Sequence, residues 1–352
     1  MSKPKTFAKY AAVFLSAVVI TSLLWNLNQM LLFRNVSYAE AYDYIIYMEE
    51  KNGENFLKVK NGTTGLVETA AVGNFSQILN SILKKNGLRI FIKSGEYNVS
   101  DNIILYNLKN VKIVGSNSNS TRLNLNGHAI IIKGESWENS ANNHIEGLEI
   151  YNGSIIIENS FKTVIKNCFF TDSERGIILS NTNGWTECSL IEECYFINVY
   201  QGIVFKAPKD DGTKSYANTE IRRVYFELRR EGAAAIHVEQ GADYNEGLLQ
   251  DVRIWMGKPA ENNQTGILLE GSMLNTVLQN VVFESFANNP RNIYGIRVGN
   301  YSDPPIIGQG VVFVGNLTGR IYNPYGKWLY SSGGAFKEEN VEIPLGTNNE
   351  FG

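Results

Sequence analysis

The sequence predicts an all-β fold: a right-handed, single-stranded parallel β-helix (solenoid) with an N-terminal capping helix and an N-terminal transmembrane or signal segment. Three observations carry this prediction. An apolar-x-x-apolar-x-apolar segment recurs, a shorter Gly-Ile-x-Leu-like segment falls between its copies, and the composition is rich in Asn, Gly, Ser, Ile and Val. Such a composition favours strands and tight turns over helices.

The longer segment recurs six times, with successive starts 20 to 30 residues apart. Its copies are IEGLEI, IKNCFF, IEECYF, IRRVYF, LQDVRI and LQNVVF, starting at Ile145, Ile165, Ile191, Ile221, Leu249 and Leu278. The shorter copies are GIIL, GIVF, AIHV, GILL and GIRV, starting at Gly176, Gly202, Ala235, Gly266 and Gly295. Loops of variable length explain the drift in period, because loop-closure entropy rises slowly with length.

One position inside the longer segment is occupied mostly by residues that tolerate the left-handed backbone conformation. These residues are Asn110, Gly147, Asn167, Glu193, Arg223, Asp251 and Asn280. Asn, Gly and Asp let the chain turn sharply and begin a new strand without a loop. We therefore expect three short strands per coil and three parallel sheets, with coils stacked at about 4.8 Å. One expected inward column consists of Ile177, Ile203, Ile236, Ile267 and Ile296.

The ends of the repeat define the expected domains. Residues 74–85 (NFSQILNSILKK) place apolar side chains at helical spacing, which predicts a helix that caps the solenoid. The β-helix is expected over 74–322. A small β leader is expected over 34–73, and a C-terminal cap and tail over 323–352.

The N-terminus predicts an anchoring or export element. A basic segment, 1–10, precedes an apolar stretch, 11–33, that is long enough to span a bilayer and would leave the bulk of the chain outside the cell. If the apolar stretch ends at Trp25, it is a signal peptide with Ala39 and Ala41 as a distant cleavage signal. The expected location is therefore the cell membrane, or secretion if the segment is cleaved. Nine Asn-x-Ser/Thr triplets favour a glycosylated exterior.

Charge and cysteine content exclude several classes of protein. The net charge is -3, without the basic excess that nucleic acid selects. Three cysteines cannot form a disulfide scaffold, and Cys168 and Cys194 occupy the same inward position on neighbouring coils, where we expect core packing. No zinc spacing and no Asp-rich calcium loop is present, so we predict no metal site and no cofactor, and calcium lacks a supporting motif.

The stretch from Ile78 to Leu105 (ILNSILKKNGLRIFIKSGEYNVSDNIIL) resembles the entry of the pectate-lyase-like β-helix superfamily, the pectin lyase fold: a helix, a strand, S/P-x-G-x-Y and another strand. The resemblance covers roughly Phe75 to Tyr322. The segment from Tyr42 to Gly65 looks like a small β leader found before such helices on archaeal-type surface proteins. The resemblance implies the fold, whereas members of the superfamily include lyases, hydrolases, epimerases, tailspikes and non-enzymatic surface proteins.

The catalytic signatures of these families are missing from the sequence. There is no N-T-D with a following D-D and G-H-G, which Asn181-Thr182-Asn183 resembles only superficially. There is also no W-x-D-H and no R-x-P-x-x-R. Both absences weaken the case for an enzyme.

The resemblance implies that substrate lies along the Gly-Ile-x-Leu sheet. On its outward face we identify His237, Glu239 and Glu270 as candidate catalytic residues. Adjacent coils place the backbones of Glu239 and Glu270 about 5 Å apart, which is compatible with a retaining pair of carboxylates. The competing interpretation is an exposed charge ladder of Lys206, Glu239 and Glu270, worth less than about 1 kcal/mol.

Six residues are candidates for substrate binding: Lys206, Arg229, Arg230, Arg297, Tyr195 and Tyr225. Arg229 and Arg230 could clamp an acidic sugar, or form a solvated charge run. Tyr195 and Tyr225 continue an outward aromatic column from Phe169, on which sugar rings could stack. A strand-stabilising ladder and a self-association surface are the alternatives.

The sequence thus predicts an extracytoplasmic protein, membrane-anchored or secreted, that binds polysaccharide or surface glycan. Whether it also cleaves the glycan, as a lyase or a hydrolase, is left open. The alternative is a non-catalytic structural or adhesive cell-surface protein.

Overall fold

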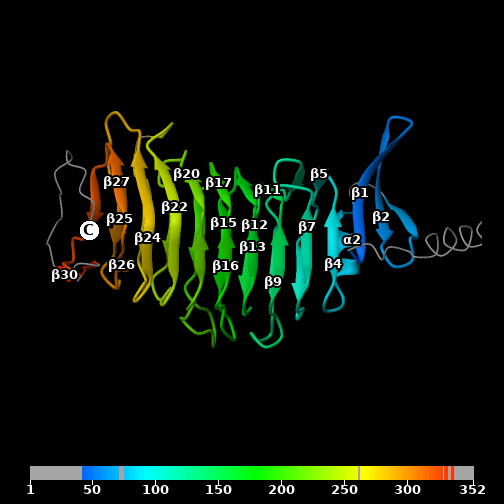
Figure 1. Cartoon of the computed structure of the whole chain (residues 1–352), viewed down its shortest axis with the longest axis horizontal. Coiled ribbons are helices and arrows are strands. Elements are labelled where there is room, and N and C mark those ends of the chain that lie inside the picture. Colours follow the sequence, from blue (N-terminus) through cyan, green and yellow to red (C-terminus); the bar gives the residue numbers. More distant parts are fainter. Residues whose placement is uncertain (1–41, 71–74, 261, 328, 332–333, 337–352) are drawn as a thin grey trace, which may run out of the picture.

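The computed structural model describes residues 42–336 except 71–74, 261, 328 and 332–333. Within these residues the chain forms an elongated parallel β-solenoid, as the repeat predicted (Figure 1). The predicted apolar segment 11–33 lies outside the described residues. Among the described residues, no helix has the length and apolar character needed to cross a bilayer.

The N-terminal end is a three-stranded antiparallel leader joined to the solenoid. Its elements are β1 (Tyr44–Lys51), β2 (Glu54–Asn61) and β3 (Val67–Ala70), and they are followed by α2 (Phe75–Ile82). β1 also pairs in parallel with the first solenoid strand, β4 (Arg89–Ile92), so the leader continues the larger sheet. α2 lies within the predicted helix. The side chain of Asn80 binds the first strand of the second sheet, accepting from the N–H of Ile104 at 2.8 Å.

The larger sheet, sheet A, has 21 strands and contains two strands from most coils. The strands before the sharp turn are β4, β7 (Lys112–Gly115), β10 (His144–Glu146), β13 (Val164–Lys166), β16 (Leu190–Glu192) and β19 (Glu220–Arg222). The strands after it are β5 (Gly95–Asn98), β8 (Thr121–Asn124), β11 (Glu149–Tyr151), β14 (Phe169–Thr171), β17 (Tyr195–Ile197) and β20 (Tyr225–Glu227). The sheet continues in β22 (Leu248–Met256), β24 (Val277–Ser285), β26 (Ile306–Ile307), β27 (Val312–Gly315), β29 (Leu329–Ser331) and β30 (Gly334–Phe336).

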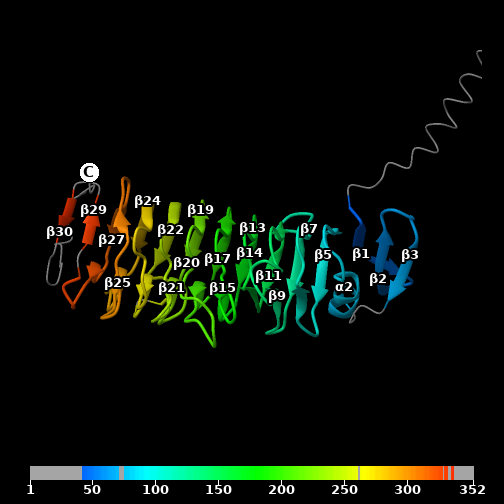
Figure 2. The same ribbon diagram turned by 90° about the horizontal axis from the view of Figure 1, so that it is seen from below.

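The second sheet, sheet B, has nine strands, one from each coil, and contains the Gly-Ile-x-Leu segments. Its strands are β6 (Ile103–Tyr106), β9 (Ala129–Lys133), β12 (Ser154–Glu158), β15 (Arg175–Ser180), β18 (Gln201–Phe205), β21 (Ala234–Val238), β23 (Thr265–Leu269), β25 (Tyr294–Val298) and β28 (Gly319–Tyr322). Figure 2 shows the leader at one end of the solenoid and β29 and β30 at the other.

The predicted sharp turns are confirmed, because all seven residues have a positive φ, from 49° at Asn167 to 69° at Gly147. We expected the turn to separate two sheets, but the two strand rows belong to one sheet. The reason is that the turn residue itself keeps the ladder intact: the N–H of Asn167 donates to the carbonyl of Glu192 at 2.9 Å. In β22 and β24 the chain runs through the turn as a single strand.

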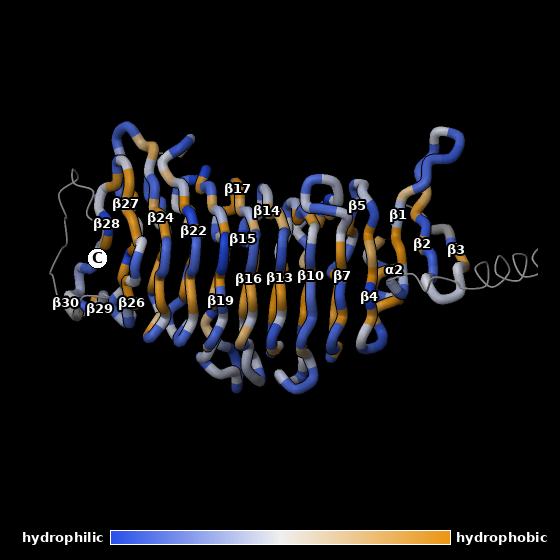
Figure 3. The backbone as a smooth tube through the Cα atoms, in the orientation of Figure 1, coloured by the Kyte–Doolittle hydropathy of each residue, from blue (hydrophilic) through white to orange (hydrophobic). Residues whose placement is uncertain are grey.

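The core lies between the two sheets. The predicted column from Ile177 to Ile296 is in register and at most 1% exposed. Phe196 stacks between Phe170 and Phe226, with ring centroids 4.6 and 4.8 Å away. A Cβ on Gly176 would meet the Phe196 ring at 2.6 Å, which explains the glycine of the Gly-Ile-x-Leu segment. Figure 3 shows the resulting alternation of apolar and polar residues along the coils.

Cys168 and Cys194 are buried in this core as free thiols, as expected from their inward position. Burial, together with the neighbouring Cys168, raises the pKa of the Cys194 thiol. Both groups therefore behave as small apolar side chains.

Candidate functional site

The outward face of sheet B carries two rows of side chains that run along the solenoid. The first row is Ile131, Ile156, Ile178, Val204, His237, Leu268, Arg297 and Tyr322. It is apolar up to Val204 and mostly polar from His237 onward. In the second row Lys206, Glu239 and Glu270 directly follow β18, β21 and β23. The second row is also polar in the N-terminal half, where Lys133 pairs with Glu158 at 2.6 Å, so the two halves differ mainly in the first row.

His237 lies at the centre of a directed hydrogen-bond network. The Nε of Arg175 donates to Gln201 Oε1 at 2.9 Å, so the amide nitrogen of Gln201 faces His237 Nδ1, also at 2.9 Å. Since the amide nitrogen is a donor, Nδ1 accepts and the ring proton lies on Nε2. Nε2 lies 2.9 Å from Glu270 Oε2. The imidazole is only 8% exposed, so the network fixes both its tautomer and its orientation.

The two carboxylates of the predicted catalytic pair have different partners. Glu239 accepts a hydrogen bond from the backbone N–H of Ala207 at 3.0 Å and lies 3.7 Å from Arg175 Nη2. Glu270 binds His237 and is half exposed. Arg175 therefore links the two acids through Gln201 and His237. This arrangement gives each carboxylate its own partners and orients both of them.

A hollow of about 420 Å³ lies next to Glu270 on the same face. We call it the tyrosine hollow; its walls include Gln240, Leu268, Glu270, Arg297, Asn300, Tyr301, Tyr322 and Tyr325. Tyr301 and Tyr325 are 70% and 54% exposed, which is unusual for large aromatic side chains. They lie in loops that follow β25 and β28, where the chain leaves sheet B.

Arg297 and Tyr322 lie beside each other on neighbouring strands and line the tyrosine hollow. The guanidinium carbon of Arg297 lies 5.9 Å from the Tyr322 ring centroid, and that ring packs 4.9 Å from the ring of Tyr294. Within the described part of the chain, Arg297 forms no ion pair with a carboxylate. The Arg297 side chain is exposed and lines the hollow together with Glu270. Its guanidinium can therefore donate hydrogen bonds to a bound ligand.

The other predicted basic residues lie away from this hollow. Arg230 pairs with Glu174 at 2.7 Å, and Arg229 pairs with Glu227 at 2.7 Å, in the loop between β20 and β21. Lys206 follows β18, and its ammonium forms no ion pair with Glu239 or Glu270. Residues 42–336, as far as they are described, contain no cluster of His, Cys, Asp or Glu that could hold a metal ion.

Tyr195 and Tyr225 lie on sheet A, away from sheet B. Their ring centroids are 5.9 Å apart, and the column extends from Phe169 through both tyrosines to Trp255 and Phe286. We call these five residues the aromatic stripe. Adjacent rings cross at angles between 48° and 75°, so successive faces do not form one flat platform. Burial, followed by the charge of Glu227, raises the pKa of Tyr225.

The sequence interpretation missed most of the tyrosine hollow. Tyr301 and Tyr325 belong to no repeat position, and no periodicity could identify them. Arg175 and Gln201 were detectable, because each directly precedes the glycine of a Gly-Ile-x-Leu segment on neighbouring coils. Their equivalent positions place them beside each other in the sheet, as the pairing of β15 with β18 shows.

No family model and no curated protein matches the chain. Among solved structures, the catalytic domain of a GH87 α-1,3-glucanase in complex with tetrasaccharides is 15% identical, with a TM-score of 0.44 over 74% of this chain and 56% of that chain. A Geobacillus virus E2 structure, ORF18, is 12% identical, with a TM-score of 0.42 over 78% and 68%. An alginate lyase from Paenibacillus sp. str. FPU-7 is 15% identical, with a TM-score of 0.35 over 73% and 96%. The chain thus spans little more than half of the glucanase domain.

Proposed function

We propose that this protein binds polysaccharide in the tyrosine hollow, on the outward face of sheet B. One observation carries the proposal: three tyrosines, an exposed arginine and an oriented carboxylate line a single hollow of about 420 Å³. The hollow is within the size range of sites that bind small ligands, so it could hold a short stretch of a longer glycan.

The lining suits the two kinds of surface that a sugar presents. Aromatic side chains such as Tyr301 and Tyr325 bury large apolar areas and keep a polar hydroxyl, which matches the C–H face and the rim of a pyranose. Glu270, Gln240 and Asn300 offer acceptors and donors for sugar hydroxyls. Arg297 adds a bidentate donor that favours a carboxylate or another anionic substituent.

Binding is better supported than cleavage. A retaining mechanism needs one carboxylate as nucleophile and another as acid, both directed at the scissile bond. Glu239 instead faces Arg175 and the backbone of Ala207, whereas Glu270 is held by His237. We therefore propose that Glu270, held in place by His237, orients hydroxyl groups of a bound glycan.

A glycan array with the full chain tests this proposal. We expect Tyr325→Ala and Arg297→Ala each to weaken binding about tenfold, since about 1.4 kcal/mol of binding energy corresponds to that factor. The matched control is Tyr195→Ala, which removes an exposed tyrosine from sheet A and should leave binding unchanged. If no glycan binds, or if only the control loses binding, the proposal fails and a structural or adhesive role is favoured.

The place of the protein in the cell is a further proposal. The basic segment 1–10 and the apolar segment 11–33 support a chain held at the membrane with residues 34–352 outside, or secreted after cleavage. Alkaline carbonate extraction of membranes separates these cases, since an anchored chain stays in the pellet. A chain found in the cytoplasmic fraction would contradict both.

We also propose that α2 caps the N-terminal end of the core. Its side chains Phe75 and Leu79 are at most 1% exposed and belong to the same apolar cluster as the first coil. The variant Leu79→Asp should therefore lower the midpoint of thermal unfolding, and an unchanged midpoint would contradict the capping role.

A further inference from the structure

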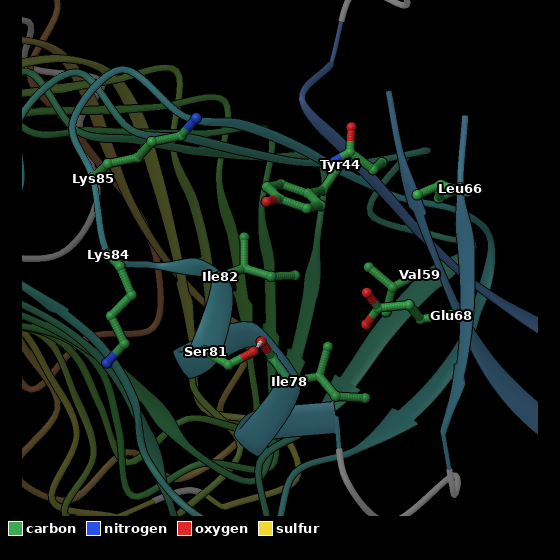
Figure 4. A pocket seen from close by; sticks show the side chains of 10 residues that line it. Tyr44, Val59, Leu66, Glu68, Ile78, Ser81, Ile82, Lys84 and Lys85 are labelled. Carbon is green, nitrogen blue, oxygen red and sulfur yellow. Dashed lines mark hydrogen bonds between the residues drawn. The ribbon is translucent and has the colours of Figure 1, made fainter. Parts of the chain in front are cut away.

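The N-terminal end of the solenoid contains a second hollow, which the glycan proposal does not use. It lies between the leader sheet and α2 and encloses about 490 Å³ (Figure 4). Its walls combine aliphatic and polar side chains, and Val59 and Leu66 on the leader face Ile78 and Ile82 on α2. Leu66 is 69% exposed, the second highest fraction among the large apolar residues of the described chain. We call this site the junction hollow.

An open sheet edge borders the junction hollow. Among the described strands, β3 pairs only with β2, so its other edge presents unpaired backbone N–H and C=O groups. Leu66 directly precedes β3 and Glu68 lies on it, and both line the hollow. An open edge beside a hollow with apolar side chains in its walls is an arrangement that accepts an added strand, with backbone hydrogen bonds to the edge and alternate side chains in the hollow.

The charges at the rim define which strand would fit. Lys84 and Lys85 follow α2 and line the hollow, against one carboxylate, Glu68. Within the described part of the chain, neither lysine forms an ion pair. The site therefore favours a strand that combines alternating aliphatic residues with an excess of acidic ones.

We propose that residues 338–345 of a second copy of this chain add a strand to β3 and fill the junction hollow. Their sequence is Glu-Glu-Asn-Val-Glu-Ile-Pro-Leu. Val341, Ile343 and Leu345 alternate and would enter the hollow, and Glu339 would share their face. Glu338 and Glu339 together would give negative charge to the end of the segment that we place near Lys84 and Lys85. Pro344 has no backbone N–H to donate. It lies between Ile343 and Leu345, at a position where the backbone N–H of the added strand would point away from β3.

The donor must be another molecule, because the two sites lie at opposite ends of one chain. β30, which ends at Phe336, lies at the far end of the solenoid from β3 (Figures 1 and 2). Nine coils at about 4.8 Å cover roughly 40 Å. Val341 can lie at most about 18 Å from Phe336, since each residue spans up to about 3.6 Å. The contact is therefore head-to-tail, and such contacts produce rings or filaments.

Sedimentation velocity of the full chain tests the proposal, in detergent because of the apolar segment 11–33. We expect association that increases with protein concentration and that is lost when residues 337–352 are deleted. The double variant Lys84→Glu with Lys85→Glu should raise the concentration needed for association at least tenfold. A matched control, Lys51→Glu with Lys209→Glu, makes the same change in net charge elsewhere and should associate normally.

Charge reversal on both sides distinguishes a specific contact from a loss of folding. Adding Glu338→Lys and Glu339→Lys to the lysine double variant should restore association. A monomeric wild-type chain at every concentration, or association that survives deletion of 337–352, would overturn the proposal. So would a lysine variant that associates as the wild type does.

Discussion

The Nε2 atom of His237 lies 2.9 Å from Oε2 of Glu270, a residue on the next coil that is 33 positions later in the sequence. The opposite ring nitrogen is held at the same distance by Gln201, which is itself held by Arg175. Side chains from four successive coils thus form the network that directs the His237 N–H at the Glu270 carboxylate. The bond positions Glu270 at the margin of the tyrosine hollow, where a ligand would meet it.

The first prediction concerns the tautomer of His237. Because Gln201 donates to Nδ1, the neutral ring should carry its proton on Nε2. Nitrogen-15 NMR of the imidazole, assigned with a His237→Gln variant, should show a protonated Nε2 and an unprotonated Nδ1 near neutral pH. A proton on Nδ1 would mean that the network runs in the opposite direction.

The second prediction tests the inward and outward assignment of two neighbouring residues. Phe196→Ala removes a ring buried between two others and should lower the free energy of unfolding by about 3–5 kcal/mol. Tyr195→Ala, one position earlier on the outward face, should cost less than about 1.5 kcal/mol, the usual worth of an aromatic pair. Urea denaturation measures both. Equal costs for the two variants would contradict the register of β17.

The third prediction concerns pH and stability. A hydrogen bond from Lys166 is the main reason why the pKa of Glu192 lies below its ordinary value of 4.5. When the pKa of a carboxyl group is lower in the folded state than in the unfolded state, the group stabilises the fold fully at a pH above its unfolded-state pKa. This stabilisation is lost as the pH falls through the folded-state pKa. Glu192→Gln should therefore lower the free energy of unfolding at neutral pH by about 1 kcal/mol or less.

Urea denaturation of both proteins across the acid range checks this third prediction. The difference between wild type and Glu192→Gln should shrink steadily below about pH 4.5, since Glu192 becomes protonated and loses its attraction for Lys166. A difference that stays constant, or that grows on acidification, would show that the ion pair is not its source.

The fourth prediction concerns the sharp turn. Asn167 has a φ of 49°, in the left-handed region where a β-branched residue is strained. Asn167→Val should cost about 1–2 kcal/mol of stability, whereas Asn167→Gly should be nearly neutral. Thermal unfolding of the two variants compares them directly. Equal stability would mean that the turn does not depend on this backbone conformation.

The repeat made most of the fold predictable because inward positions recur with a period of two along each strand. The column from Ile177 to Ile296 and the turn at Asn167 follow from that pattern alone. It also placed His237, Glu239 and Glu270 on one face. The same pattern places Arg175 beside Gln201 but carries no information about how far a side chain reaches, so the separate partners of Glu239 and Glu270 were not predictable.

The tyrosine hollow escaped prediction for a different reason. Tyr301 and Tyr325 lie in loops, whose conformation is set by tertiary contacts rather than by a periodic core. The sequence instead indicated Tyr195 and Tyr225 as sugar-binding candidates. They do share a column, but they lie on sheet A and not beside the tyrosine hollow. At the repeat position that pairs with Tyr225, the next coil has Arg253. The stripe continues instead through Trp255, two residues later, which the repeat did not indicate.

Hydroxyl-radical footprinting of the tyrosines, with and without a bound oligosaccharide, tests whether the tyrosine hollow is the glycan-binding site. Occupation of the tyrosine hollow should protect Tyr301 and Tyr325 and leave Tyr195, which is similarly exposed, unchanged. Protection of Tyr195 and Tyr225, with the tyrosines of the hollow still reactive, would move the glycan to the aromatic stripe and contradict the account.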